Sequence, residues 1–268
     1  MTRLDELRSR GLGSPRTILR LWVLLLGYVS LMQDEAWGQA HCEAGSAPLV
    51  QITPPNFNQA EVIARFAANE AASKQAMSTY GYDEDLTIQS LSEGRTDGEY
   101  RVVSRMAADG AGKIVRTAIS PAQDRLERVR VTSPDLEAIR HRMRFMLPTE
   151  DLPAYELRFL GTQRVDDLDT EVFSVTPAPS STGERLQGRL WVDAVGAVVV
   201  MTCGRMAGGA GNAGDVVLSV YREQIDGRYW FPTYVRAEGT LHVGLADVLV
   251  RETGKFTNYR RVVGLAGH

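Results

Sequence analysis

The sequence predicts a mainly β domain built on one antiparallel sheet, and three observations lead to this class. From Tyr82 onward apolar residues recur with a period of two, which is the mark of half-buried strands. About a dozen such segments follow one another across short turns, whereas parallel strands need long crossovers. Two further segments have helical spacing. We therefore expect an α+β chain dominated by strands, with two helices added to its sheet.

Two helices are predicted from their start signals. The first covers residues 58–79, because Asn58 and Glu61 resemble a capping box ahead of an apolar stripe. The second begins at Ser133-Pro134, which supplies an N-cap and a proline in the first turn. It must stop before Pro148, since proline cannot continue a helix.

The strands are predicted from alternating apolar residues, and Asp226-Gly227 between two of them is a strong hairpin signal. Residues 177–183 and 207–214 read as loops within one domain, because no linker divides the chain. The alternating residues that mark the strands are Leu86/Ile88, Tyr100/Val102, Val115/Ile119, Val129/Val131, Tyr155/Leu157/Phe159, Phe173/Val175, Leu190/Val192, Val198/Val200, Val216/Leu218/Val220, Tyr229/Phe231, Leu241/Val243 and Phe256.

The first forty residues differ from the rest of the chain. Five arginines precede an apolar run over residues 21–32. A membrane-spanning helix needs roughly 20 apolar residues, whereas a signal peptide needs only about 7–15. Gly38-Gln39-Ala40 places small residues at the positions that a signal peptidase recognises. We therefore expect residues 1–40 to be a signal peptide that is cleaved after Ala40. The alternative is an N-terminal anchor that is retained. Residues 41–57 then form an extended arm and residues 58–268 a single β domain.

Charge and cysteine content narrow the function classes. The formal charge of −3 makes the chain a poor nucleic-acid binder, because binding phosphates needs clustered Lys and Arg. Cys42 and Cys203 are the only cysteines. In an oxidising export compartment they can pair, and two free thiols are the alternative.

The sequence contains no complete catalytic or metal-binding pattern. Residues 209–214 match G-x-G-x-x-G, but a strand pattern follows them where a dinucleotide site needs a helix. The four histidines show no metal-ligand spacing, and no G-x-S-x-G elbow is present. The acidic residues at 166, 167 and 169 read as a solvated hairpin tip. We expect no enzyme activity, metal or cofactor.

What remains is apolar and aromatic, and it predicts a site for a hydrophobic ligand. Methionine suits adaptable surfaces, and a curved sheet with an apolar concave face makes a cavity. The alternative is that these side chains simply fill the core. The candidate lining residues are Met143, Phe145, Met146, Leu157, Phe159, Trp191 and Phe231.

Two segments resemble a known family. Residues 187–193 (QGRLWVD) and 221–234 (YREQIDGRYWFPTY) are similar to bacterial outer-membrane lipoprotein-sorting proteins, the LolA/LolB-like superfamily. The similarity runs from about Asn58 to Val262. It implies an unclosed antiparallel β half-barrel of about eleven or twelve strands, with helices covering its concave face over an apolar cavity. Alternation sends Phe231 and Trp230 to opposite faces of their strand. Because Phe231 has no polar group and Trp230 has one, we assign Phe231 to the concave side.

The resemblance also implies a function. Family members shield the acyl chains of lipoproteins during passage through the periplasm, which requires neither a catalytic residue nor a cofactor. We therefore expect a periplasmic carrier or chaperone for lipoprotein acyl chains or related lipids, with inner- or outer-membrane proteins as further partners. The alternative is an RseB-like periplasmic sensor that binds a membrane protein. A shared fold does not guarantee a shared ligand.

Overall fold

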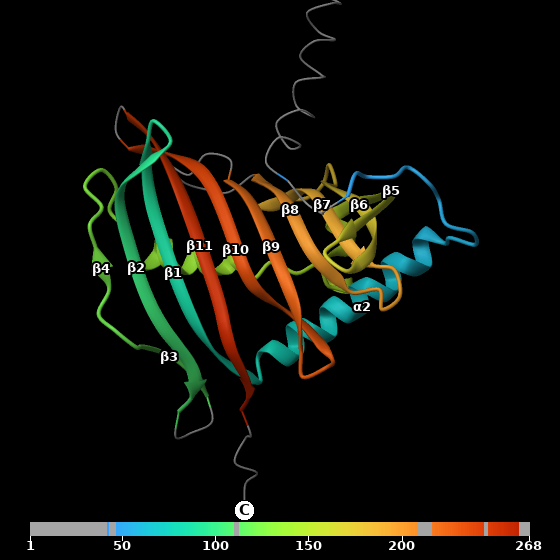
Figure 1. Cartoon of the computed structure of the whole chain (residues 1–268), viewed down its shortest axis with the longest axis horizontal. Helices are drawn as coiled ribbons and strands as arrows, with labels where there is room; N and C mark the ends of the chain where they lie inside the picture. Colours follow the sequence, from blue (N-terminus) through green and yellow to red (C-terminus); the bar gives the residue numbers. More distant parts are fainter. Residues whose placement is uncertain (1–41, 43–46, 110–112, 208–215, 244–245, 263–268) are drawn as a thin grey trace, which may run out of the picture. The chain divides into compact units, whose positions relative to one another are not determined.

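The structure is a computed structural model that describes residues 42, 47–109, 113–207, 216–243 and 246–262 (Figure 1). All of them belong to one compact unit, Cys42–His268. The expected signal segment, residues 1–40, lies outside the described residues. Within the described part, no helix has the length and apolar character to cross a lipid bilayer.

The described chain forms one antiparallel sheet of eleven strands, as the alternation predicts. Its order is β3-β2-β1-β11-β10-β9-β8-β7-β6-β5, with β4 beside β2. The strands at the two ends do not pair with each other, so the sheet is an unclosed half-barrel (Figure 1). The strands are β1 (Tyr80–Ser92), β2 (Arg95–Ala108), β3 (Ile114–Ala118), β4 (Gln123–Asp124), β5 (Tyr155–Val165), β6 (Leu168–Pro177), β7 (Arg185–Asp193), β8 (Val199–Ala207), β9 (Val216–Ile225), β10 (Tyr229–Val243) and β11 (Ala246–Arg261).

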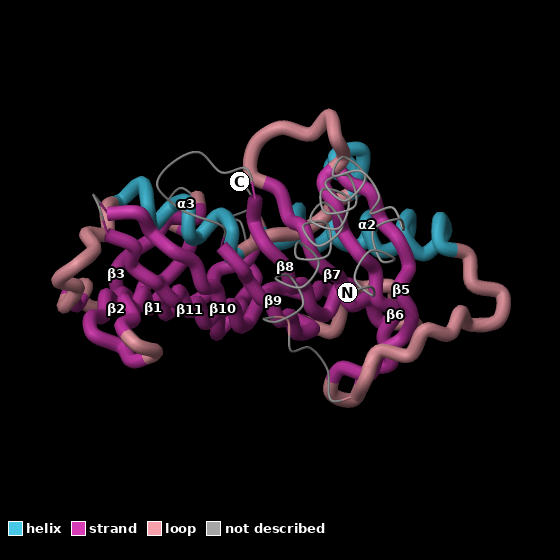
Figure 2. Tube along the Cα trace, turned by 90° about the horizontal axis from the view of Figure 1, so that it is seen from above, coloured by secondary structure: helices cyan, strands magenta, loops and turns pink. Residues whose placement is uncertain are grey.

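In the described part of the chain, two helices and one 3₁₀ turn accompany the sheet: α2 (Gln59–Met77), α3 (Ser133–Met143) and η1 (Thr149–Ala154). Asn58 caps α2 by accepting from the backbone N–H of Glu61 at 3.3 Å. The N-cap of α3 is Thr132 and not Ser133 as predicted. The Thr132 side chain accepts from the Asp135 backbone N–H, and the Asp135 carboxylate accepts from the Thr132 backbone N–H at 2.8 Å, which completes a capping box. Both helices lie on the same side of the sheet (Figure 2).

Two strand predictions are wrong. Val129 and Val131 belong to no strand; the chain leaves the edge of β2 after β4, and these two side chains pack against the core instead. Tyr229/Phe231 and Leu241/Val243 belong to a single strand, β10, which is irregular between Pro232 and Tyr234.

The turn predictions are confirmed where positive φ is needed. Asp226 and Gly227 have φ of 51° and 64° and join β9 to β10. These values suit a two-residue hairpin turn, whose twist matches that of the flanking strands. Asp166, with φ of 50°, lies in the turn between β5 and β6.

The free edge of β5 is covered along much of its length. The Gln59 carboxamide donates to the Leu157 carbonyl at 3.2 Å and accepts from the Phe159 N–H at 3.1 Å, as a neighbouring strand would. Further along, Val50 exchanges two backbone hydrogen bonds with Thr162, at 2.8 and 2.9 Å. Covering an edge in this way hinders pairing with another chain.

The strands β6–β9 carry apolar residues on both faces. One face packs against the helices; the other forms what we call the arm-covered cluster, in which Cys42 and Leu49 of the N-terminal arm pack on the sheet. Cys42 and Cys203 form a disulfide with their Cα atoms 5.7 Å apart, which satisfies the geometric condition for pairing. The buried sheet residues of this cluster are Val165, Val172, Trp191, Val200, Met201 and Cys203.

Removing the disulfide is expected to lower the free energy of unfolding by about 2–4 kcal/mol, since it constrains an unfolded chain across 161 residues of sequence. Urea unfolding with and without dithiothreitol measures the effect. A Cys42→Ser/Cys203→Ser double variant is the control and should not respond to the reductant. Equal stability of the reduced and oxidised wild type, or two thiols alkylated without reduction, would contradict the pairing.

Candidate functional site

The face of the sheet that carries the helices is the candidate site, and we call it the helix-covered face. Phe66 and Ala67 of α2 and Ile139 and Met143 of α3 meet the sheet there in one apolar cluster. Gly254 of β11 lies so close to the Met143 sulfur that a Cβ would stand 2.7 Å from it. The helices therefore pack directly on the strands.

Polar contacts hold α2 across several strands. Gln59 binds the edge of β5, as described above, and the Asn69 side chain donates to the Ala197 carbonyl at 2.7 Å. Further along α2, Glu70 is buried and forms an ion pair with Arg222 of β9. The helix is thus fixed near its start and near its middle.

Glu70 and Arg222 also hold the segment that links the two helices, and we call this arrangement the clamp. Arg222 Nη2 donates to the Phe145 carbonyl at 2.8 Å, and Glu70 Oε2 accepts from the Leu147 N–H at 2.9 Å. Both charged side chains are almost fully buried: the exposed fraction is 0% for the Arg222 side chain and 3% for the Glu70 side chain. The clamp therefore joins α2, β9 and the segment after α3 in a single buried contact.

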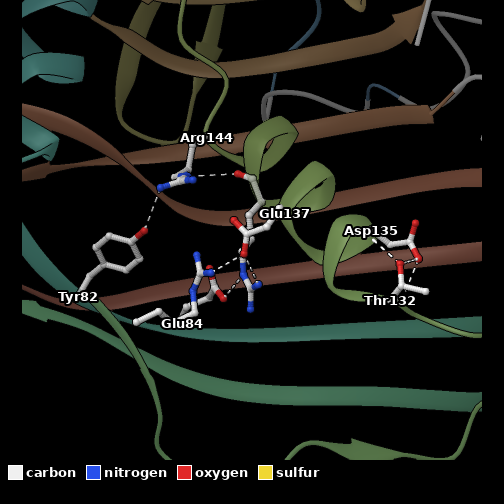
Figure 3. Close-up of polar contacts among 8 residues, drawn as sticks. Tyr82, Glu84, Thr132, Asp135, Glu137 and Arg144 are labelled. Carbon is white, nitrogen blue, oxygen red and sulfur yellow. Dashed lines mark hydrogen bonds and ion pairs between the residues drawn. The ribbon is translucent and has the colours of Figure 1, made fainter. Parts of the chain in front are cut away.

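A second chain of charges holds α3 on β1 and β3 (Figure 3). The Arg140 guanidinium binds Glu84 of β1 at 2.7 Å, and both side chains are buried. Glu137 accepts from Arg140 at 3.1 Å and from Arg116 of β3 at 2.6 Å. Burial alone would raise the pKa of Glu137, but the two arginines outweigh it and the pKa is lowered. Glu137 is therefore held in its charged form.

The last turn of α3 reaches further strands. Arg142 binds Glu252 of β11 at 3.1 Å and lies 3.9 Å from Glu184, just before β7. Burial raises the pKa of Glu252. Arg144 donates to the Tyr82 hydroxyl at 3.4 Å (Figure 3). All of these attachments are side-chain contacts, because α3 belongs to no strand ladder.

The structure brings four of the seven predicted lining residues into the helix-covered cluster: Met143, Phe145, Leu157 and Phe159. Phe159 packs on Phe57 and Phe173, with ring centroids 4.2 and 5.7 Å apart. Met143 is 1% exposed, whereas the other three are half-buried. The half-buried members keep surface that a ligand can reach.

The other three predicted residues lie elsewhere. Met146 and Phe231 pack with Tyr80 beside Met77 at the end of α2, where Phe231 is 0% exposed. Trp191 belongs to the arm-covered cluster, on the face of β7 opposite to Leu190. The seven residues therefore do not line one common cavity.

Sequence reasoning missed the clamp, although a signal for it is present. Val216, Leu218 and Val220 alternate inward along β9, and Arg222 occupies the next inward position. Glu70 likewise lies one helical turn after Phe66, on the buried face of α2. A charged residue that continues an apolar series is a signal for a buried partner, since an unpaired charge there would be costly.

Among the described residues, no three His, Cys, Asp or Glu side chains gather as metal ligands would. His242 binds Asp247 at 2.6 Å on an exposed part of the β10–β11 hairpin. The helix-covered face therefore offers burial of apolar groups, and its charged side chains are used to attach the helices.

No protein-family model matches the chain, and no curated protein matches it. Three solved structures are similar to it. A DUF1329 family protein from Desulfovibrio piger is 14% identical over 74% of this chain and 92% of its own, with a TM-score of 0.35. A "putative outer membrane lipoprotein-sorting protein domain" from Vibrio parahaemolyticus is 13% identical over 75% and 94%, with a TM-score of 0.38. A LolA superfamily protein from Nitrosomonas europaea is 14% identical over 72% and 93%, with a TM-score of 0.30.

Proposed function

We propose that this chain is a periplasmic carrier or chaperone that holds the acyl chains of lipoproteins, or of related lipids, on the helix-covered face of the half-barrel. The observation that carries the proposal is the single apolar cluster shared by the two helices and the concave sheet, with half-buried Phe145, Leu157 and Phe159 at its margin. Each acyl methylene buried there stabilises the complex by about 0.8 kcal/mol.

Acyl binding on this face requires the helices to move. Met143, Leu147 and Phe173 have exposed fractions of 1%, 0% and 0%, so water does not reach them in this state. The helices are attached to the sheet by side chains, and these contacts can break without opening a strand ladder. Once α3 lifts, the apolar side chains beneath it become available to an acyl chain, and methionine adapts readily to such a partner.

Export is part of the proposal. Residues 1–40 would be removed after Ala40, and the mature chain would begin at His41, one residue before the disulfide cysteine Cys42. A disulfide suits an oxidising compartment such as the periplasm. N-terminal sequencing of the exported protein tests this step. A product that still begins near Met1 would contradict cleavage and would favour a retained N-terminal membrane anchor.

Acyl binding is tested with a fluorescent fatty-acyl probe and two matched variants. Leu157→Gln, on the half-buried margin of the helix-covered face, is expected to weaken binding roughly tenfold, because a leucine contact contributes about 1.5 kcal/mol or more. Leu249→Gln makes the same chemical change at a 40% exposed position of β11 and should leave the affinity unchanged. Mass spectrometry of lipids extracted from the purified protein provides an independent measurement.

The complete burial of Met143 and Phe231 also favours a second candidate, an RseB-like sensor that binds a membrane protein. A packed face without acyl-binding capacity would suit such a regulator. If the wild type shows no saturable binding of an acyl probe or a lipopeptide, and no lipid is extracted from it, the carrier proposal fails and the sensor becomes the better account.

A further inference from the structure

The two sulfur atoms of the Cys42–Cys203 disulfide differ in their access to solvent. Cys203 of β8 is 0% exposed, whereas Cys42 of the N-terminal arm is only half-buried. A thiol from solution can therefore approach the Cys42 sulfur and not the Cys203 sulfur. In thiol–disulfide exchange the sulfur that is not attacked leaves as a thiolate. Attack on Cys42 thus makes Cys203 the leaving group.

Two neighbours of Cys203 stabilise a thiolate at this position. The Ser219 hydroxyl of β9 donates to Cys203 Sγ at 3.2 Å. On the other side, Arg189 of β7 lies directly opposite Cys203, so the two side chains share a face with their Cβ atoms about 4.5–5.5 Å apart. The Arg189 guanidinium has no carboxylate partner among the described residues. Apolar burial opposes ionisation of a thiol, and a nearby cation and hydroxyl offset that cost.

The arm fits closely on the sheet through a small set of contacts. The Gln163 carboxamide of β5 donates to the Ala47 carbonyl at 2.7 Å and accepts from the Trp191 indole N–H at 2.7 Å. Beside it, a Cβ at Gly161 would overlap the Val50 carbonyl oxygen, so only glycine leaves room for the arm. The arm and the arm-covered cluster are therefore connected through one side chain of β5.

Little of the arm itself is buried. Leu49 packs on the arm-covered cluster, but Val50 and Ile52 are 43% and 64% exposed. Fixing each residue of a free chain costs conformational entropy, and a few hydrogen bonds with one apolar contact contribute less than the ordering of the whole arm costs. The disulfide therefore determines whether the arm stays on the sheet.

Removing the arm would uncover a strongly apolar surface. Trp191 and Met201, beneath the arm, are 1% and 0% exposed. Contiguous apolar surface of this kind is typical of interaction sites on proteins. This surface lies on the face of β6–β9 opposite to the helix-covered face, so it is separate from the proposed acyl site.

We propose that Cys42 is a site of thiol–disulfide exchange with a reduced dithiol, and that reduction releases the N-terminal arm and uncovers the arm-covered cluster. A thiolate of the dithiol bonds to Cys42 Sγ, the bond between the two cysteine sulfurs breaks, and its electron pair leaves on Cys203, which takes up a proton. The second thiol of the partner then attacks the partner's own sulfur in the mixed disulfide. Cys42 leaves as a thiol, and the partner is oxidised to a disulfide.

The site of attack is tested on the exported protein with reduced glutathione, without denaturant, by acid quenching and peptide mass spectrometry. We expect the glutathione adduct on Cys42 and a free thiol at Cys203. The rate of full reduction is measured with dithiothreitol. Arg189→Gln should slow that rate roughly threefold to tenfold, because the leaving thiolate loses its cation. Arg158→Gln makes the same change at an exposed position of β5, three strands away, and should not alter the rate.

Release of the arm is measured by tryptophan emission. After cleavage at Ala40 the chain keeps two tryptophans, Trp191 and Trp230, and both belong to the arm-covered cluster. Reduction is expected to shift their emission to longer wavelength while the far-ultraviolet circular dichroism stays unchanged. The Cys42→Ser/Cys203→Ser double variant should show the shifted emission without any reductant.

Four results would overturn the proposal. Reduction only in urea that unfolds the protein would make the disulfide purely structural, and an adduct on Cys203 would contradict attack at Cys42. Unchanged emission after complete reduction would show that the arm stays in place without the disulfide. Loss of the circular dichroism signal on reduction would show that the disulfide holds the whole domain and not the arm alone. The double variant should bind the acyl probe as the wild type does, and weaker binding would contradict the independence of the two faces.

Discussion

Replacing Arg222 by leucine is expected to lower the free energy of unfolding by about 3–5 kcal/mol. The substitution leaves the Glu70 carboxylate buried without its cation, and an uncompensated buried charge is strongly destabilising. It also removes the hydrogen bond to the Phe145 carbonyl. Urea unfolding followed by circular dichroism measures the change.

Two variants identify the cause of that loss. Glu70→Gln combined with Arg222→Leu should recover part of the stability, because the buried charge is then gone. Arg236→Leu breaks an ion pair with Glu238 in which the arginine is 49% exposed, and it should cost less than about 1 kcal/mol. If Arg222→Leu costs no more than Arg236→Leu, the clamp does not stabilise the fold.

The clamp also connects stability with the proposed function. Phe145 and Leu147, which it holds, lie in the segment between α3 and η1 that must move if α3 lifts from the sheet. Under conditions where Arg222→Leu stays folded, we expect the acyl probe to bind faster than it binds the wild type. A slower or unchanged association rate would mean that another contact, such as Arg140–Glu84, limits opening.

The parts of the fold that depend on local sequence are predictable. Period-two alternation marks strands because each strand has one face toward the helix-covered core, and Asp226-Gly227 marks a turn because both residues tolerate positive φ. The pairing of β1 with β11 is different. It joins residues such as Leu86 and Gly254, which are far apart in the sequence, and no local pattern encodes that choice.

The candidate site was harder to predict because both faces of β6–β9 are apolar. Alternation correctly places Leu190 and Trp191 on opposite faces of β7. It does not reveal that the helices cover the face of Leu190 and that the N-terminal arm covers the face of Trp191. A sheet covered on both sides has no polar face to set the orientation. The clamp was not predicted because it also depends on tertiary packing: Glu70 and Arg222 are far apart in the sequence and meet only where α2 crosses β9.

Phe231→Asp is expected to unfold the protein at neutral pH. Phe231 is 0% exposed and packs among the rings of Tyr80, Tyr229 and Tyr259, with centroids 5.1–5.9 Å away. Losing a buried phenylalanine costs about 3–5 kcal/mol by itself, and burying an unpaired carboxylate adds several more. The sum approaches or exceeds the typical stability of a domain, about 5–15 kcal/mol. Circular dichroism and urea unfolding measure this loss.

The pH dependence of that variant identifies the buried charge as the cause. Burial raises the pKa of an introduced carboxyl in the folded state, so the stability of Phe231→Asp should be greater below about pH 4 and should fall as the pH rises. Phe231→Asn, a neutral side chain of the same size, should lack this added dependence relative to the wild type. Identical pH profiles for the two variants would show that lost packing alone accounts for the effect.

Acyl binding at this position is better tested with Phe231→Leu, which keeps the site apolar and should cost less than about 1.5 kcal/mol. If Phe231 contacts the acyl chain once the helices move, the leucine variant should bind the probe several-fold more weakly while remaining folded. A folded variant with unchanged affinity would assign Phe231 to the core alone, where it supports the end of α2 through Met77 and Met146. The acyl chain would then lie nearer to the half-buried Leu157 and Phe159, on the other side of the clamp from Phe231.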